Sequence, residues 1–387
     1  MSRKRVASLL LVAALLMALV AAGCGKGGQA SEIRIGYSGP LSGDAAAWGQ
    51  QEQWALKVAE KEINDAGGVL GKPIKVIMYD DRGDKVEVVN TVKRLITQDK
   101  VVAVLTHNFS SCSLAVAPLA EQYKIPFVTN MATHPTVTVP SPGQVRPFYF
   151  RATFTTLVEG GSLAAFLAQK GFKKAAVVYD LSQDYSLGLR DAFKNKFTSL
   201  GGTVVAEESI KGGEEDFRAA VTRLAAAQPD VIVLTVFYKE GALFIKQARE
   251  LGVQQQFAGG AGLESDVLTQ LAGDAVEGTY IVTHFTPEDP RPIVQSFREK
   301  FKQLANLEPD ANGATARDAL YMVVEAIKKA GKADPVAIRD ALEQTTNLEG
   351  VTGTITIDPK THNPRMDAVI TQVQGGKLRF VQRVQPD

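Results

Sequence analysis

Short apolar runs rich in β-branched residues alternate with amphipathic stretches along most of the chain. In its first part, we expect strands at residues 33–37, 74–79, 101–105 and 127–129. Between them, apolar residues recur every three or four positions at 55–66 and 88–96, which is the spacing of one helix face. Strict alternation of strand and helix predicts parallel sheets with right-handed crossovers.

The alternation pauses over a proline-rich stretch, residues 135–154, and then resumes. We predict helices at 157–170, from about 185, 215–227 and 240–251, and strands at 175–179, 203–207, 231–236 and 256–259. Long helices are expected at 293–305, 314–330 and 336–343, and two last strands at 368–373 and 378–384. Two such series in 387 residues exceed one hydrophobic core and predict an α/β protein with two Rossmann-like lobes.

The first 24 residues differ in character from the rest. Basic residues at positions 3–5 precede an apolar run at 6–20, and small residues then lead to Cys24. This pattern predicts an export signal over residues 1–23, because the apolar run is too short and too abruptly ended for a transmembrane helix. An N-terminal membrane anchor that is never cut is the alternative.

Cys24 directly follows Val-Ala-Ala-Gly, and this sequence resembles the lipobox of bacterial lipoproteins. The resemblance implies that Cys24 begins the mature chain and carries a lipid. Residues 24–31 are then expected to form a flexible tether. The mature protein would be extracytoplasmic, in the periplasm or at the outer face of the cytoplasmic membrane.

Composition narrows the possible partners. The 43 Lys and Arg nearly balance the 42 Asp and Glu, and no basic cluster can be traced along the chain, so nucleic acid is not an expected partner. Besides Cys24, the only cysteine is Cys112. No internal disulfide is therefore expected after export.

Small polar residues follow two successive predicted strands. Ser110 and Ser111 lie between the strand at 101–105 and a helix expected to start near Ser113, and the strand at 127–129 is followed by Asn-Met-Ala-Thr-His-Pro. Ligands of parallel sheets bind beyond the carboxyl ends of the strands, where hydroxyls and a helix N-terminus can hold a carboxylate. Helix capping alone would explain one serine.

Several motifs, in order along the chain, resemble the leucine/isoleucine/valine-binding proteins, the type I periplasmic binding family that supplies ABC importers. They include IGYSGPLSGDAAAWG, SSCSLAVAPLAEQYKIPFVTNMATHP, DFRAAVTRLAAAQPDVIVL and GVTGTITID. The resemblance covers essentially the whole mature chain and implies two lobes, joined by a hinge, that close over a small ligand. The expected N-terminal lobe comprises residues 32–152 and 285–350, and the C-terminal lobe residues 153–284 and 351–387.

For the first lobe, the resemblance implies four ligand contacts. The serine that binds the ligand carboxylate corresponds to Ser110, or less closely to Ser111. The carbonyl that accepts from the ligand ammonium corresponds to Met131, and the threonine that binds both groups to Thr133. Trp48 corresponds to the aromatic lid.

In the second lobe, the family's two tyrosines correspond to Tyr185 and to Phe237, with Tyr238 beside it. The glutamate that pairs with the ligand ammonium is missing, since the aligned residue is Ala261. A buried ammonium without its charge partner costs roughly 3–5 kcal/mol, so a substitute is required. The candidates are Glu264, Asp266, Asp184 and Glu240. Alternatively, the ligand is an aliphatic or aromatic acid without an ammonium group.

Catalytic motifs are not found. The sequence has no G-x-S-x-G elbow, no P-loop and no G-x-G-x-x-G that opens a helix after a strand. His107, Cys112 and His134 could approach one another and hold zinc, but separate packing is the simpler interpretation. We predict no enzymatic activity, no cofactor and no metal.

Together these features predict the solute-binding lipoprotein of an ABC importer. It would bind a branched-chain amino acid or a related small carboxylate and deliver it to a membrane permease served by separate ATPase subunits. A ligand sensor on the same scaffold is the alternative.

Overall fold

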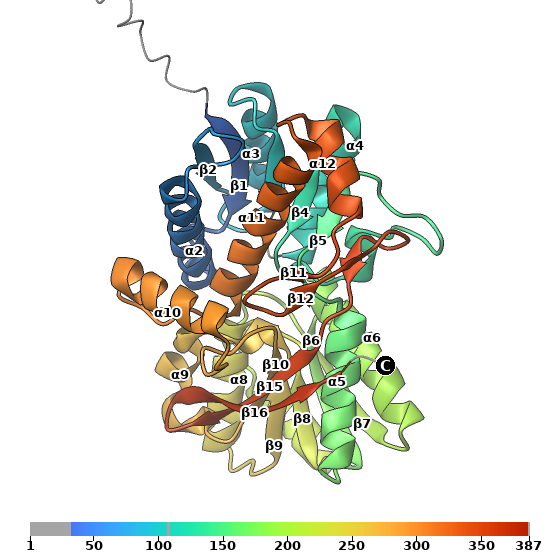
Figure 1. Cartoon of the computed structure of the whole chain (residues 1–387). Helices are drawn as coiled ribbons and strands as arrows, with labels where there is room; N and C mark the ends of the chain where they lie inside the picture. Colours follow the sequence, from blue (N-terminus) through green and yellow to red (C-terminus); the bar gives the residue numbers. More distant parts are fainter. Residues whose placement is uncertain (1–31, 107–108, 386–387) are drawn as a thin grey trace, which may run out of the picture.

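The computed structural model describes residues 32–106 and 109–385, which form two lobes, each built around one sheet (Figure 1). Within these residues, the first sheet has the strand order β2-β1-β3-β4-β5, and neighbouring strands are parallel. Its strands are β1 (Ile33–Gly39), β2 (Ile74–Asp80), β3 (Ala103–Thr106), β4 (Phe127–Thr129) and β5 (Tyr149–Arg151).

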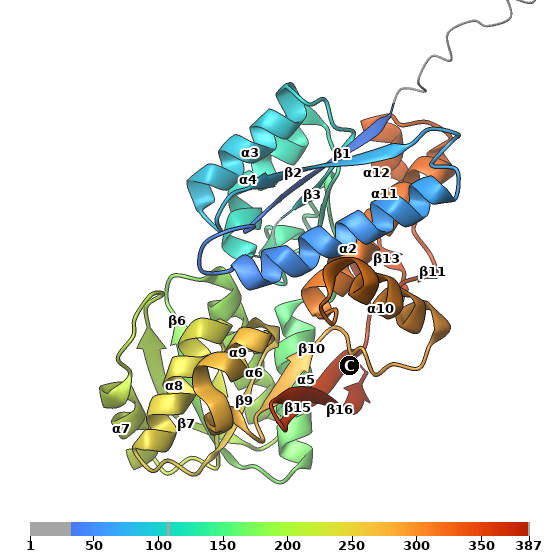
Figure 2. The ribbon, with the colours of Figure 1, turned by 90° about the vertical axis from the view of Figure 1, so that its left-hand side faces the viewer.

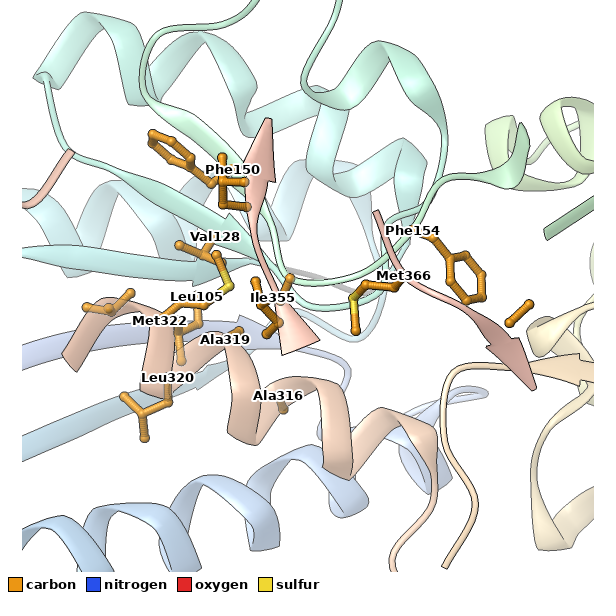
Figure 3. Close-up of a cluster of buried hydrophobic side chains, with 14 of the residues drawn as sticks. Leu105, Val128, Phe150, Phe154, Ala316, Ala319, Leu320, Met322, Ile355 and Met366 are labelled. Atoms are coloured by element: carbon orange, nitrogen blue, oxygen red, sulfur yellow. The ribbon is translucent and has the colours of Figure 1, made fainter. Parts of the chain in front are cut away.

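Helices from two distant parts of the chain cover this first sheet. They are α2 (Ala46–Asp65), α3 (Lys85–Thr97) and α4 (Ser110–Tyr123), and later α10 (Pro292–Ala305), α11 (Ala311–Ala330) and α12 (Pro335–Glu343). Figure 2 shows α10 and α11 alongside α2. In Figure 3, Leu105 and Val128 of the sheet face Ala319 and Met322 of α11 in one buried apolar cluster.

The second sheet is mixed. Its order in the described residues is β16-β15-β10-β9-β8-β6-β7, parallel from β7 to β10 and antiparallel at β15 and β16. Its strands are β6 (Lys174–Asp180), β7 (Thr203–Ile210), β8 (Val231–Leu234), β9 (Gln256–Gly259), β10 (Tyr280–Thr283), β15 (Ala368–Gln374) and β16 (Lys377–Val384). Its helices are α5 (Thr156–Gln169), α6 (Asp184–Ser199), α7 (Arg218–Ala226), α8 (Tyr238–Glu250) and α9 (Asp266–Ala272).

The chain passes between the sheets after β5, after β10 and before β15. The short strands β11 (Leu348–Glu349), β12 (Thr354–Ile355), β13 (Ile357–Asp358) and β14 (Asn363–Pro364) precede the last passage. β13 packs against α12 and β14 against β5, so this segment accompanies the first sheet. We therefore place the last crossing after residue 364, later than the expected boundary at 350; the division into lobes stays a proposal.

Arg151 lies at the first crossing between the sheets and makes hydrogen bonds to two other connecting segments. Its side chain is fully buried, and Nε donates to Asn363 Oδ1 at 2.9 Å. Nη2 donates to the carbonyl of His134 at 2.8 Å, and Nη1 donates to that of Ala132. The guanidinium thus joins the loop after β4 to the segment that leads to the last crossing.

Local signals explain where several helices begin. The side chains of Asp84, Asp310 and Asp334 accept hydrogen bonds from backbone N–H groups at the starts of α3, α11 and α12. α4 begins at Ser110 rather than near Ser113, because Phe109 already has the extended backbone of an N-cap residue. Ser110 and Ser111 therefore belong to the first turn of the helix.

The described part of the chain contains no helix that has both the length and the apolar character of a membrane span.

Candidate ligand-binding site

A small cavity lies where the two lobes meet. It is lined by residues that follow strands of both sheets, by α2 and α6, and by the start of α11: Trp48, Phe109, Met131, Thr133, Tyr185, Phe237, Ala261, Gly262, His284 and Asn312. The carboxyl ends of parallel strands expose backbone groups and short loops, and here two such edges face each other. The topology thus brings residues far apart in the sequence into one wall.

Aromatic rings form much of this wall and meet across the lobes. Phe109 of the first lobe stacks on Phe237 of the second, with ring centroids 4.8 Å apart. Trp48 contacts Phe237 edge-on at 5.1 Å, and Tyr185 stacks on Phe237 at 5.6 Å. Such pairs contribute about 0.5–1.5 kcal/mol each beyond area burial, so the rings favour a closed arrangement.

Hydrogen bonds also connect the lobes around the cavity. Trp48 Nε1 donates to the carbonyl of Glu264 at 2.7 Å, and the Tyr238 hydroxyl donates to the carbonyl of Asp44 at 2.6 Å. Ser111 Oγ donates to Gln183 Oε1 at 3.1 Å. The lobes are therefore in direct contact on both sides of the cavity.

The expected first-lobe residues lie in or next to the cavity. Met131 and Thr133 line it, and Thr133 is only 1% exposed. Ser110 lies one layer behind, where its Oγ accepts a hydrogen bond from the backbone N–H of His134 at 3.1 Å. Ser111 instead bonds across the lobes, as described above, and roles of these residues in ligand binding stay predictions.

Glu159 of α5 does not line the cavity itself but lies behind Ala261, a residue of the second-lobe wall. Its Oε1 accepts from the Tyr185 hydroxyl and from the Ala261 backbone N–H, each at 2.8 Å. The backbone N–H of Gly262 donates to the Tyr185 oxygen at 3.0 Å. Burial raises the pKa of Glu159 to about 7, although these hydrogen bonds favour its charged form.

Gly260 allows this arrangement. A Cβ at residue 260 would lie 2.3 Å from Glu159 Oε1 and 2.5 Å from the Tyr185 oxygen. Any larger residue would therefore displace both side chains.

His284 follows β10 and lines the cavity with a neutral ring. Its Nδ1 shares a hydrogen bond with Thr153 Oγ1 at 2.5 Å, and the ring stacks on Phe154. Burial lowers the pKa of His284 to about 3, so the imidazole carries no charge near neutral pH.

Glu264 is buried and does not line the cavity. Its carboxylate accepts hydrogen bonds from the Thr283 hydroxyl and from the backbone N–H of Ala311, the latter at 3.0 Å. Burial raises its pKa to about 8. The other acids considered as substitutes do not line the cavity either; these are Asp184, Glu240 and Asp266.

Five residues of the site were not foreseen. Phe109 lies in the short segment between the run 101–105 and Ser110, and His284 directly follows the apolar run 280–283, so reasoning from strand ends could have included both. Gly262 and Asn312 carry no comparable signal, and Glu159 is inside a helix, where only tertiary packing brings it to the loop after β9.

The suggested zinc or thiol site is not formed by the residues that can be placed. Cys112 is buried and its Sγ donates to the carbonyl of Gly83, while His134 Nδ1 bonds to Thr136. Among residues 32–106 and 109–385, no cluster of His, Cys, Asp or Glu could hold a metal ion. His107 and Cys24 lie outside the described residues.

The model of a family described as "Periplasmic binding protein" matches residues 32–377. The chain belongs to this family. The resemblance found in the sequence is therefore confirmed, and with it the two-lobed α/β fold. It is a family of binding proteins rather than of enzymes.

Known relatives of this periplasmic binding protein cover nearly its whole length. A Leu/Ile/Val-binding protein homolog from Brucella melitensis is 30% identical over 92% of this chain and 95% of its own. The structure of a leucine-binding protein from Thermotoga maritima superimposes with a TM-score of 0.86 at 33% identity, covering 92% of this chain and 99% of its own.

A third relative binds a different ligand. It is a solute-binding protein of an ABC transporter from Rhodopseudomonas palustris, whose structure was solved in complex with 3,4-dihydroxybenzoic acid. Its TM-score is 0.81 at 27% identity, over 92% of this chain and 98% of its own. The family resemblance alone therefore leaves the ligand open.

Proposed function

We propose that this protein is the extracytoplasmic solute-binding lipoprotein of an ABC importer. It binds a branched-chain amino acid or a related small carboxylate between its lobes and delivers the ligand to a membrane permease with separate ATPase subunits. Lipid on Cys24 keeps it at the membrane. The observation that carries the proposal is the cavity, whose wall is shared between the strand ends of the two lobes.

The ligand would act as a bridge between the lobes. Its carboxylate would lie near the first turn of α4, where backbone N–H groups and the hydroxyls of Ser110 and Thr133 can donate. Its apolar part would lie among the rings of Trp48, Phe109 and Phe237. A ligand that contacts both lobes stabilises the closed form relative to the open one.

An acid without an ammonium group is the second candidate ligand. Two observations favour it: the residue aligned with the family's ammonium-binding glutamate is Ala261, and the cavity wall is rich in aromatic rings. The relative that holds 3,4-dihydroxybenzoic acid is an example of such a ligand in the family.

Calorimetry on the mature chain tests this function. Leucine, isoleucine and valine would be titrated beside their 2-keto acid counterparts and 3,4-dihydroxybenzoate. We expect saturable binding of at least one of these, with the ligand recovered unchanged. No binding of any of them, or chemical conversion of the bound ligand, would contradict the proposed function.

A further inference from the structure

We propose that Glu159 provides the negative charge that recognises the ammonium group of an α-amino acid, in place of the glutamate absent at Ala261. This inference rests on the proposed function. Of the two ligand classes considered there, it selects α-amino acids over acids without an ammonium group. It makes the natural ligand a zwitterion rather than a simple acid.

The Glu159 carboxyl group lies directly behind the cavity wall. Glu159 is fully buried, and its Oε1 is held by the Tyr185 hydroxyl and by the N–H of Ala261, which both belong to cavity-lining residues. Its carboxylate therefore reaches the backbone of the very residue from which the family's glutamate would extend. Gly260 leaves the space that this requires.

Several polar atoms around this carboxyl group are buried beside the cavity. Among the described residues, Glu159 Oε2, Thr133 Oγ1 and His284 Nε2 are buried and make no hydrogen bond of good geometry, although the Thr133 hydroxyl interacts with the Glu159 carboxylate and favours its charged form. A buried polar atom without a good partner costs about 1–3 kcal/mol, so this group of atoms beside one cavity indicates a ligand that completes their hydrogen bonds. An ammonium has three N–H donors and carries the charge that a carboxylate needs.

The cavity wall carries no positive charge. The residues that line the cavity include no Lys or Arg, and the His284 ring is neutral. An acid without an ammonium group would bring a second negative charge beside Glu159, with no cation to offset it. Like charges at close range disfavour each other, so Glu159 selects against such acids unless it is protonated.

A purely structural role for Glu159 makes different predictions. The hydrogen bonds to Tyr185 and Ala261 join α5 to α6 and to the loop after β9, and these bonds alone could account for a buried glutamate. Glu159→Gln retains the shape and an acceptor oxygen but removes the charge. A structural role would lower the unfolding temperature and weaken all ligands alike.

The test compares leucine with 4-methyl-2-oxopentanoate, its 2-keto acid, by calorimetry on the wild type and on Glu159→Gln. We expect the variant to lose at least about 100-fold in leucine affinity, since the ammonium then lacks its charge partner. Affinity for the 2-keto acid should stay the same or rise. Glu250→Gln, at an exposed glutamate of α8, is the matched control and should change neither affinity.

The pH dependence of the wild type gives a readout that needs no variant. With a raised pKa near 7, Glu159 becomes protonated as the pH falls, so leucine affinity should fall below about pH 7 by up to about tenfold per unit. Affinity for the 2-keto acid should rise over the same range. Tyr185 and His284, which lie around it, stay neutral there, because burial raises the pKa of the tyrosine well above its usual value and lowers that of His284 to about 3; burial also lowers the pKa of His134.

The remaining outcomes distinguish a failure of the proposed function from a failure of the role proposed for Glu159. If the wild type binds neither compound nor any other carboxylate tested, the proposed function itself is wrong. If it binds leucine and Glu159→Gln binds leucine equally well, or if the variant loses both ligands in parallel, the role of Glu159 is overturned while the proposed function stands. A wild type that binds only the 2-keto acid would also overturn the role of Glu159.

Discussion

Thr133 is the first-lobe residue whose side chain is best placed to contact a ligand. It lines the cavity, it is almost fully buried, and its hydroxyl lies beside the Glu159 carboxylate without a hydrogen bond of good geometry in the described residues. Its backbone carbonyl accepts from the N–H of Thr156 at 2.8 Å, which fixes the loop after β4 against the start of α5. The side chain is thereby held in place before a ligand arrives.

Replacing this hydroxyl by a methyl group should weaken binding with little change in fold. A hydrogen bond to a charged group contributes about 1.5–3 kcal/mol, so Thr133→Val should reduce ligand affinity by roughly 10- to 150-fold in calorimetry. Thr222→Val, at an exposed threonine of α7, is the control and should bind as the wild type does. Equal affinities for all three proteins would exclude a ligand contact at Thr133.

At the residue scale, the site could be predicted only in part from the sequence. Met131, Thr133 and Phe237 follow strands, and in a parallel sheet the strand ends face the ligand, so their placement in the cavity wall was predictable. The placement of Glu159 near the cavity was not predictable, because it depends on how α5 packs against α6 and the loop after β9. No local pattern in a helix interior reports such an approach.

At the scale of elements, α6 lies against the loop after β4 of the other lobe. A Cβ at Gly188 in α6 would lie only 2.7 Å from Cδ2 of His134. His134 is held by Thr136, so its ring cannot move aside freely. A glycine at this position permits the lobes to close fully.

Gly188→Ala should therefore oppose closure without harming the helix. Overpacking costs about 1–3 kcal/mol, which corresponds to roughly 5- to 150-fold weaker ligand binding. Alanine favours a helix over glycine by about 1 kcal/mol, so the ligand-free chain should unfold at an equal or higher temperature. Calorimetry and thermal unfolding check both halves of this prediction.

The control for this variant is Gly161→Ala in α5, where an added Cβ meets nothing within 4 Å. It should leave ligand affinity unchanged. If Gly188→Ala also bound normally, close contact between α6 and the loop after β4 would not be part of the ligand-bound state.

Most elements were predictable because their periodicities are strong. The runs at β1, β2 and β6 contain apolar β-branched residues whose side chains are buried, and the helices at α3, α8 and α11 show an apolar stripe. β5 was missed because it has only three residues inside a proline-rich stretch. The late crossing after β14 depends on contacts with β5 and α12, which no local pattern reveals.

At the scale of the whole molecule, the proposed lipid anchor links the binding cycle to the membrane. Cys24→Ser should abolish lipid attachment, so the exported chain should move from the membrane fraction to the soluble fraction. The mass of the wild-type chain should exceed that of residues 24–387 by the mass of the lipid, and the variant should lack this addition. A variant that still fractionates with membranes would indicate an uncut N-terminal anchor instead.

Closure of the lobes is the property on which the proposed function depends. The contacts of Trp48 with Phe237 and Glu264, and of Tyr238 with Asp44, are all made between the lobes, so they are present only when the lobes meet. They contribute to a closed state that a ligand has to stabilise by contacts with both sides. The ligand-free chain should then spend much of its time open and less compact.

Small-angle X-ray scattering tests closure of the lobes most directly. It would be measured with and without a ligand that calorimetry has shown to bind. We predict a smaller radius of gyration at a saturating concentration of this ligand than in its absence, and no such decrease with an amino acid that does not bind. An unchanged radius of gyration at full saturation would contradict the account.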